Sequence, residues 1–386
     1  MKSIYLTFSI YPQNSGQSVY SYALAKSLIK NTKLYLFSYG DQEYDKEKSD
    51  LLDIFEQIYF YKYNESWGLK SIITKLAVLN YIDEKMLTDI VECIQREQIS
   101  TVIIDHIGMT SFFYPLKRRF PNLNYVYSSQ NVESLNIVDS LLYGGRNKKC
   151  WRLRAILNKV AERLILNNVD NIISISDKDT QYFINKMHIV KPIYLSHPQY
   201  NFICLKNTMN FNKFNKKLLI VGSMNWYPNI LGTIRFVREV YSELITIDSE
   251  YELYIVGKNP TQEIIDLSFK YQGVVITGFV DDVDVYYNLC DIAIVPVFEG
   301  SGIKIKLIEA IAKGMPVISS AFAAKDYDIK DEICVANSKQ EFIDSILKIS
   351  QEVEYRKSLH KGSLSLFNTI IKSDPDIDNI FKGVLE

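Results

Sequence analysis

Strand and helix signals alternate through the first half of the sequence, and the same alternation starts again in the second half. Short apolar runs such as KSIYLTFSI (2–10) and TVIIDH (101–106) predict buried strands, with helical periodicity between them. The second half repeats the pattern from KLLIVGSM (217–224) onward. Because helices join consecutive parallel strands, the alternation predicts parallel sheets covered on both faces. The fold class is α/β, with two Rossmann-like domains facing each other across a deep cleft.

A polar, unpatterned stretch separates the two halves, and a chain of 386 residues suits two domains of about 150–200 residues. A further helix is predicted to begin at Asp374–Pro375 and to cross back to the first domain. The predicted divisions are a first domain (1–200), a linker (201–216), a second domain (217–372) and the C-terminal helix (373–386).

Composition excludes several classes of function. The net charge of −1 argues against nucleic acid as a partner, and four His without ligand spacing argue against a metal. Five scattered Cys without a CxxC pattern favour reduced thiols. No signal peptide and no apolar run of 18 residues are evident, so we expect a cytoplasmic protein.

The segment 291–320 predicts a ligand site. DIAIVPVF (291–298) reads as a strand, EGSG (299–302) as a turn, IKIKLIEAIAKG (303–314) as a helix and MPVISS (315–320) as a second strand. A Gly-rich turn that opens a helix aims unpaired N–H groups at one spot, with the positive end of the helix dipole behind them.

Charged residues extend this site along the helix. Lys304 is predicted in the first turn, where its ammonium can reach the same spot, with Lys306 as a second cation. Glu309 lies roughly 10 Å further along, about the distance from a diphosphate to its ribose. The segment is therefore shaped to hold a nucleoside diphosphate. The alternative is a solvated face, since Glu309 and Lys313 form an i,i+4 pair.

Glycines at three other predicted strand ends point to the same ligand. Gly222 and Ser223 follow KLLIV, Gly257 follows YELYIV, and Gly278 with Phe279 follows VVIT. Each can bring backbone close to a ligand, although turn geometry alone also explains a glycine at a strand end.

The first half offers candidates for the opposite wall. Gly16 lies in a turn before a helix and can approach a phosphate or a sugar, the alternative being a capped turn. His106 ends a strand, where it can bind a sugar hydroxyl or serve structure alone. The candidate acceptor-binding residues are Ser15, Gln17, Asn131 and Glu133.

Residues 146–163 form a basic patch on an amphipathic helix, with an apolar stripe that includes Val160 and Leu164. Such a helix can rest on the anionic surface of an inner membrane or grip a phosphate-bearing acceptor. The alternative is a core helix with a solvated basic side.

With these residues in hand, the chain resembles glycosyltransferases of the GT-B fold in family 4 (group 1). The long block VPVFEGSGIKIKLIEAIAKGMPVIS carries most of the resemblance. Shorter similar blocks are GSMNWYPN (222–229), YIVGKNP (254–260), ITGFVDDV (276–283), SSQNVESL (128–135) and Glu162 with SISDKD (174–179).

The resemblance implies transfer of a sugar from a nucleotide donor to a glycan, lipid-linked or protein acceptor, with retention and without a metal or other cofactor. The donor would be UDP-, GDP- or dTDP-linked, and the setting bacterial polysaccharide or lipid-linked oligosaccharide assembly. It implies that the first domain (1–200) binds the acceptor and the second domain (217–372) binds the nucleotide sugar. The candidate catalytic residues are Lys304, Lys306 and His106. The donor-binding residues would be Gly16, Gly222, Ser223, Gly257, Gly278, Phe279, Ser301, Gly302, Ile303 and Glu309.

The sequence departs from the family pattern at several positions. Glu309 matches the second Glu of Glu-x7-Glu, but Ser301 stands at the first. Ser223 and Pro228 replace an Arg and a Lys, whose charge Lys304 and Lys306 would supply. Gln130 replaces the His of the family block HNVES. These departures keep open a non-catalytic subunit that binds glycan or peptide, and a nucleotide-sugar epimerase is a third reading.

Overall fold

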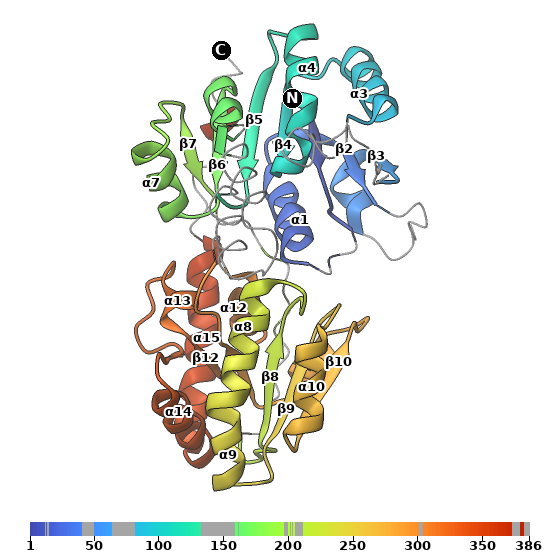
Figure 1. Ribbon diagram of the computed structural model, residues 1–386. Coiled ribbons are helices and arrows are strands. Elements are labelled where there is room, and N and C mark those ends of the chain that lie inside the picture. Colours follow the sequence, from blue (N-terminus) through green and yellow to red (C-terminus); the bar gives the residue numbers. More distant parts are fainter. Residues whose placement is uncertain are drawn as a thin grey trace. The chain divides into compact units, whose positions relative to one another are not determined.

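The computed structural model divides into two compact units (Figure 1). Unit 1 comprises Met1–Tyr200 with Ser373–Glu386, and unit 2 comprises Asn201–Lys372. The chain therefore leaves unit 1 once and returns to it at the end. The structure describes residues 1–11, 13, 15–40, 50–63, 82–132, 159–160, 162–196, 200, 202, 204, 211–300, 304–372 and 379–381.

Unit 1 is built on one parallel sheet. Its strands in the described residues are β1 (Lys2–Thr7), β2 (Lys33–Tyr39), β3 (Phe55–Tyr61), β4 (Thr101–Asp105), β5 (Asn124–Ser129), β6 (Asn171–Ser174) and β7 (Ile193–Leu195). They lie in the order β3-β2-β1-β4-β5-β6-β7, and every pairing is parallel (Figure 1). The strand order reverses between β1 and β4, and ligands of such sheets bind at the carboxyl ends beside this switch point.

Helices of unit 1 begin at side-chain caps where the sequence offers them. The described helices are α1 (Gly16–Leu28), η2 (Asp50–Asp53), α3 (Glu84–Glu97), η3 (Ile107–Phe112), α4 (Phe113–Arg119) and α7 (Asp177–Asn185). Helix α7 is an example. The cap is Ser176, whose hydroxyl accepts a hydrogen bond from the Asp179 N–H at 3.1 Å.

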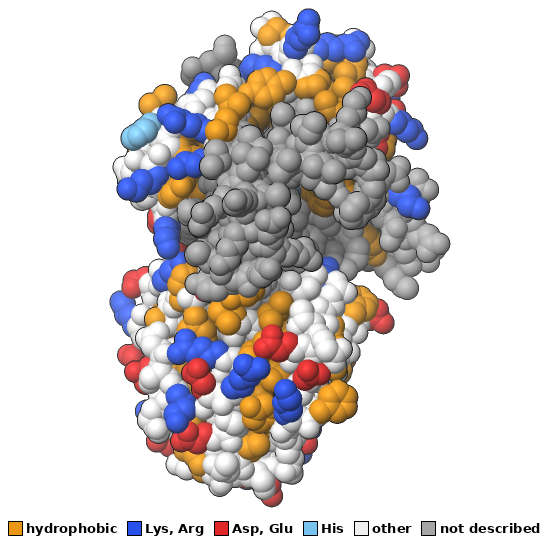
Figure 2. All heavy atoms as spheres, viewed as in Figure 1, with side chains coloured by type: hydrophobic (Ala, Val, Ile, Leu, Met, Phe, Trp, Pro, Cys, Tyr) orange, Lys and Arg blue, Asp and Glu red, His pale blue; other side chains and the backbone are white. Residues whose placement is uncertain are grey.

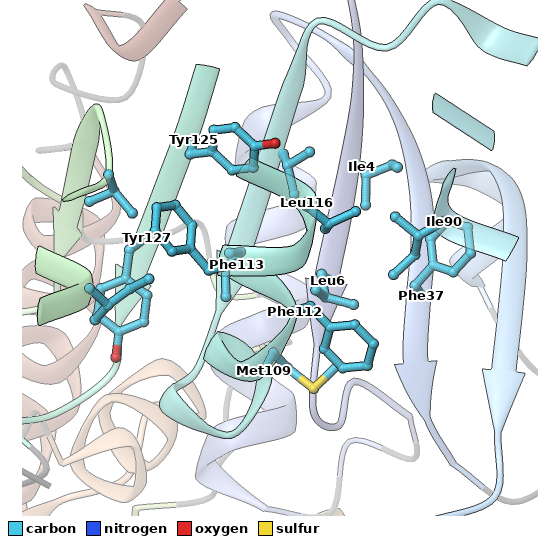
Figure 3. Packing of buried hydrophobic residues seen from close by; sticks show 14 of the residues in the cluster. Ile4, Leu6, Phe37, Ile90, Met109, Phe112, Phe113, Leu116, Tyr125 and Tyr127 are labelled. Atoms are coloured by element: carbon cyan, nitrogen blue, oxygen red, sulfur yellow. The ribbon is translucent and has the colours of Figure 1, made fainter. Parts of the chain in front are cut away.

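The core of unit 1 forms where the strands meet the helices. All residues of β1 after Lys2 are buried, so the strand is covered on both faces. Figure 3 shows Leu6 and Phe37 of the sheet beside Ile90 of α3 and Phe112 of η3. Each fully buried side chain of this size contributes about 1.5–3 kcal/mol of transfer free energy. This burial explains why the strands appear in the sequence as continuous apolar runs.

Unit 2 repeats the architecture. Its described strands are β8 (Lys217–Val221), β9 (Glu252–Val256), β10 (Val274–Gly278), β11 (Ile292–Val295), β12 (Val317–Ser319) and β13 (Cys334–Val335). They lie in the order β10-β9-β8-β11-β12-β13, again all parallel. The predicted α/β class with two parallel sheets is confirmed.

The helices of unit 2 depart from the predicted pattern in two places. The described helices are α8 (Tyr227–Arg235), η5 (Phe236–Tyr241), α9 (Ser242–Ile247), α10 (Gln262–Lys270), α11 (Asp284–Leu289), α12 (Ile305–Ala312), α13 (Ala321–Ala324), α14 (Lys339–Gln351) and α15 (Val353–Lys372). The stretch 229–244, which has the pattern of one continuous helix, contains a π-helical segment, η5. Helices α14 and α15 complete the unit without a sequence prediction.

Two segments tie the ends of unit 2. The Arg356 guanidinium of α15 donates a hydrogen bond to the Phe211 carbonyl at 2.7 Å. The Asn215 N–H donates to the Asp291 carboxylate at 2.9 Å. Of the C-terminal segment predicted as a helix, the described part is 379–381, a single turn of 3-10 helix with Ile380 and Phe381 buried.

Candidate functional site

The carboxyl ends of three neighbouring strands in unit 2 carry glycines that lie side by side. The Gly222 N–H donates to the Val256 carbonyl at 2.9 Å, and the Gly257 N–H donates to the Gly278 carbonyl at 3.1 Å. A Cβ at Gly257 would lie 1.8 Å from the Gly222 carbonyl oxygen, so the two turns can approach this closely only without a side chain. The structure thus brings three of the predicted residues to one edge of the sheet.

Lys306 extends from α12 to this edge. Its ammonium would lie 3.2 Å from a Cβ at Gly222, and it donates a hydrogen bond to the side-chain oxygen of Asn229. The Asn229 amide nitrogen in turn donates to the Ser223 carbonyl at 2.9 Å. Burial, with a smaller effect of the nearby Lys304 charge, lowers the pKa of Lys306 to about 7. Among the described residues, the groups that act on this half-buried ammonium are Asn229 and Lys304, and neither carries a negative charge.

The Gly turn before α12 lies beside the start of α8. Gly300 has a φ of +105°, which favours glycine, and a Cβ there would lie 3.1 Å from the Pro228 ring. Gly232 of α8 lets its helix approach the Pro296 carbonyl, where a Cβ would lie only 1.8 Å away. Glycines at two contacts thus bring α8 and the turn after β11 together.

The sequence predicted Lys304 in the first turn of the helix, and this prediction is wrong. Lys304 is the N-cap residue, with φ −95° and ψ 84°, and α12 begins at Ile305. Its side chain is 8% exposed, and its ammonium lies 5.3 Å from the centroid of the Phe322 ring. The predicted donor-binding residues 301–303 lie outside the described residues.

Glu309 lies one turn beyond Lys306 on α12. Burial raises the pKa of Glu309 to about 7, with Lys313 lowering it and Asp284 raising it. The Tyr287 hydroxyl donates a hydrogen bond to the Glu309 carboxylate. The Lys313 ammonium pairs with Asp284 at 2.6 Å, so it is not free to neutralise Glu309 alone. The half-buried carboxylate is poised between its two protonation states near neutral pH.

His106 follows β4 in unit 1, with a backbone φ of +80°. Such a conformation is strained for a residue with a Cβ and is often found at functional sites. The Gly108 N–H donates to His106 Nδ1 at 3.0 Å, and the ring packs on Phe8 with centroids 5.8 Å apart. Because Nδ1 accepts a hydrogen bond, the neutral ring carries its proton on Nε2.

A buried carboxylate precedes His106. The donors to Asp105 in the described part of the chain are neutral: Tyr5, Thr7, Ser21 and Gln130, at 2.5–3.1 Å. Gln130 stands where the family motif has His, and its amide nitrogen contacts both carboxylate oxygens. Sequence comparison indicated the missing His but not this role.

The remaining candidates of unit 1 lie at strand and helix ends. Ser15 caps α1 in a reciprocal capping box with Ser18, and Gly16 is the exposed first residue of the helix. The side-chain nitrogen of Gln17 is buried without a hydrogen-bond partner among the described residues. The Asn131 carbonyl accepts from the Ser129 hydroxyl at 2.8 Å. Glu133 lies outside the described residues.

Most of the basic segment 146–163 also lies outside the described residues. Val160 and Leu164 are 51% and 50% exposed, so these two positions do not face a core. Ile165 and Leu166 are buried instead.

On the visible face of unit 2, basic and acidic side chains are interspersed (Figure 2).

The described residues contain neither a membrane-spanning helix nor a cluster of metal ligands. None of their helices is both long enough and apolar enough to cross a bilayer. Likewise, within the described ranges, no three His, Cys, Asp or Glu side chains are grouped so as to hold a metal ion.

Comparison with known proteins identifies the unit that carries the glycine edge. Residues 215–352 match the family described as Glycosyl transferases group 1. The match covers most of unit 2, which is therefore similar to the domains of this family. The family resemblance predicted from the sequence is thereby confirmed.

Solved structures extend the likeness to the whole chain. Sucrose-phosphate synthase from Thermosynechococcus elongatus is 16% identical, with a TM-score of 0.66 over 96% of this chain and 95% of that chain. TarM from S. aureus, in complex with Fondaparinux, alpha-GlcNAc-glycerol and UDP, is 12% identical, with a TM-score of 0.65 over 100% of both chains. At such identities the likeness shows the fold, which is GT-B.

A curated relative matches part of the sequence. It is a 44.6 kDa protein in a cps region of Klebsiella pneumoniae, 24% identical over 182 residues. The match covers 45% of this chain and 47% of the relative, so it spans about half the length of that protein.

Asn229 and Tyr287 were not among the sequence candidates. Each binds one of the charged residues of α12, Asn229 to Lys306 and Tyr287 to Glu309. The only available signal for Asn229 was a polar residue just after Pro228 at the start of a helix. Tyr287 had none, because its ring continues an ordinary helical pattern.

Proposed function

We propose that this glycosyltransferase moves a sugar from a nucleotide-sugar donor to a glycan, lipid-linked or protein acceptor, with retention and without a metal. One observation carries the proposal: Lys306 and Glu309 project from one helix, and Lys306 reaches the glycine edge. A cation beside backbone turns suits a diphosphate, and a carboxylate one turn further suits a ribose diol.

The donor-binding roles follow from this arrangement. Lys304 and Lys306 would stabilise the charge that develops on the departing diphosphate, an electrostatic role that requires no divalent ion. Gly222, Gly257 and Gly278 would let the backbone approach the nucleotide. Ser223 and the 56% exposed Phe279 would line the same edge, together with residues 301–303.

The roles in unit 1 concern sugars. We assign His106 as a hydrogen-bond donor through Nε2, since Nδ1 already accepts from Gly108. Gly16 would bring backbone to the donor. The acceptor would contact Ser15, Gln17, Asn131 and Glu133, and the buried amide nitrogen of Gln17 supports a polar ligand there.

UDP-sugars are the first donors to test, because the TarM structure contains UDP. The cps region of the K. pneumoniae relative supports a role in bacterial polysaccharide biosynthesis. A cytoplasmic enzyme could meet a lipid-linked acceptor at the membrane surface. The exposed Val160 and Leu164 beside Lys159 and Arg163 support such a contact within 146–163.

A thermal-shift screen across UDP-, GDP-, ADP-, CMP- and dTDP-sugars tests the proposal. A ligand at 100 times its dissociation constant adds about 2.7 kcal/mol of stability. We expect one donor to raise the Tm and to be cleaved to nucleoside diphosphate, with the rate unchanged by EDTA. Glu309→Gln should abolish the shift. No shift and no release with any of the donors would contradict a transferase.

The alternative is a non-catalytic subunit that binds glycan or peptide. Ser301 at the first position of Glu-x7-Glu favours it. A glycan-induced Tm shift without donor hydrolysis would support this alternative, whereas donor cleavage would exclude it.

A further inference from the structure

Two contacts connect α11 with α12 in unit 2. The Tyr287 hydroxyl donates to the Glu309 carboxylate. Asp284, one turn before Tyr287 on α11, pairs with Lys313 at 2.6 Å. Lys313 is the C-cap of α12, one turn after Glu309. The two contacts therefore form an antiparallel ladder that fixes the rotation of α12 about its axis at Glu309.

Tyr287 is suited to a fixed orientation. The residue is 1% exposed, so its ring has little freedom to turn. Burial, together with the charges of Glu309 and Asp284, raises the pKa of the Tyr287 hydroxyl well above its usual value. The hydroxyl thus stays protonated, and its single proton is given to Glu309. Glu309 is only half-buried, so its remaining lone pairs are open to a ligand.

We infer that Tyr287 is a positioning residue that holds the Glu309 carboxylate in the orientation that accepts both hydroxyls of a ribose. The inference rests on the proposed function and adds to it a determinant of ribose over deoxyribose. A carboxylate with one oxygen tied to a rigid donor presents the other in a fixed direction, which reduces the entropy lost on binding.

The same hydrogen bond favours the ionised form of Glu309. The groups that act on Glu309 are Tyr287 and Asp284 of α11 and Lys313 of α12. On α15, which also packs against α12, His360 contacts the Gly314 carbonyl at 2.8 Å, beyond the end of the helix. Removing the Tyr287 hydroxyl removes a hydrogen bond that lowers the pKa of Glu309, so the carboxyl of the variant stays protonated to higher pH.

Binding of UDP and 2′-deoxy-UDP to Tyr287→Phe, measured by calorimetry, tests the inference. We expect the preference of the wild type for UDP to fall about 10- to 100-fold in the variant, the loss of one hydrogen bond to a charged group. The preference should recover between about pH 6 and about pH 8 as Glu309 ionises. Tyr286→Phe on the same helix is the matched control and should bind as the wild type does.

Two results would overturn the inference in different ways. Wild-type protein that binds both nucleotides equally would contradict the ribose role of Glu309, and with it the positioning role. Full discrimination in Tyr287→Phe at both pH values would contradict the positioning role alone. Combining Tyr287→Phe with Glu309→Gln should cost no more than Glu309→Gln by itself, which a purely structural Tyr287 would not produce.

Discussion

The two sheets are both parallel, but the charged groups at their carboxyl edges differ in burial. At the edge of unit 1, Asp105 is fully buried, and its donors in the described residues are hydroxyl and amide groups. Its capacity as an acceptor is used inside the protein. At the edge of unit 2, Lys306 and Glu309 are half-buried, and burial moves the pKa of each to about 7.

The difference shows that chemistry resides in the turns and the helix starts rather than in the sheet. In the described part of unit 1, neutral donors surround the buried Asp105 carboxylate directly before His106, so the charge at this edge is held inside the protein. Ionisable groups that are partly desolvated instead gain stabilisation when a charged ligand replaces water. We therefore infer that unit 1 is built for sugar hydroxyls and unit 2 for a nucleoside diphosphate.

The largest expected effect is on the stability of unit 1, through Asp105 at the carboxyl edge of its sheet. Asp105→Ala leaves several buried donors without an acceptor, and we expect the free energy of unfolding of unit 1 to fall by about 3–5 kcal/mol. Urea unfolding followed by hydrogen exchange, resolved by unit, measures this loss. Unit 2 should keep its protection.

Asp170 provides the matched control for that change. Its carboxylate accepts from the Tyr125 N–H at 2.9 Å and pairs with Lys117 at 3.2 Å, but its side chain is 41% exposed. Asp170→Ala should therefore cost about 1 kcal/mol. Equal losses in the two variants would contradict a special role for the buried network.

The next effect concerns the charged edge. Lys304→Ala should lower turnover about 100-fold with little change in fold, because it removes a cation from the departing diphosphate. Steady-state kinetics with the donor found by the thermal screen measures the change. Lys306→Ala should behave alike, with an added loss of donor affinity because Lys306 lies at the Gly222 turn.

Lys325 provides the control for Lys304→Ala, because it tests whether any nearby positive charge has the same effect. Its ammonium lies 3.5 Å from the centroid of Phe322, the same ring that faces Lys304. Lys325→Ala removes one positive charge nearby and should leave turnover within about twofold. A similar collapse in all three variants would indicate a diffuse electrostatic effect, and unchanged turnover in Lys304→Ala would refute its catalytic role.

The sequence was informative where the signal is local. Parallel strands buried on both faces appear as apolar runs, so both sheets were predicted from the alternation. Strand-end glycines and the charges of α12 were visible for the same reason. The start of α12 was predicted at Ile303, two residues before its first residue Ile305, because the N-cap Lys304 makes no side-chain cap that the sequence could reveal.

The contacts that the sequence did not reveal join residues far apart in the chain. Asn229 meets Lys306, Tyr287 meets Glu309, and Gln130 meets Asp105 only after the strands and helices have packed. A hydrogen bond across elements leaves no periodic trace in the sequence. Such contacts decide the charge state of a site, so sequence alone identified the ionisable groups but not their pKa shifts.

The smallest effect follows from those shifts. Under the proposed function, donor binding needs the Glu309 carboxylate, which is lost as pH falls through its pKa of about 7. It also needs the Lys306 ammonium, which is lost as pH rises through its pKa of about 7. The affinity for UDP should therefore pass through a maximum near neutral pH.

Calorimetric titration of UDP across the pH range should show about a tenfold loss of affinity on each side of that maximum. Glu309→Gln should remove the acidic limb, and Lys306→Met should remove the basic limb, since the ionisation of UDP itself is common to all three proteins. Unit 1 supplies the contrast, because His106→Gln should leave both limbs in place. If the pH profile of Glu309→Gln kept its acidic limb, the charged edge of unit 2 would not be the part of the molecule that binds the nucleotide.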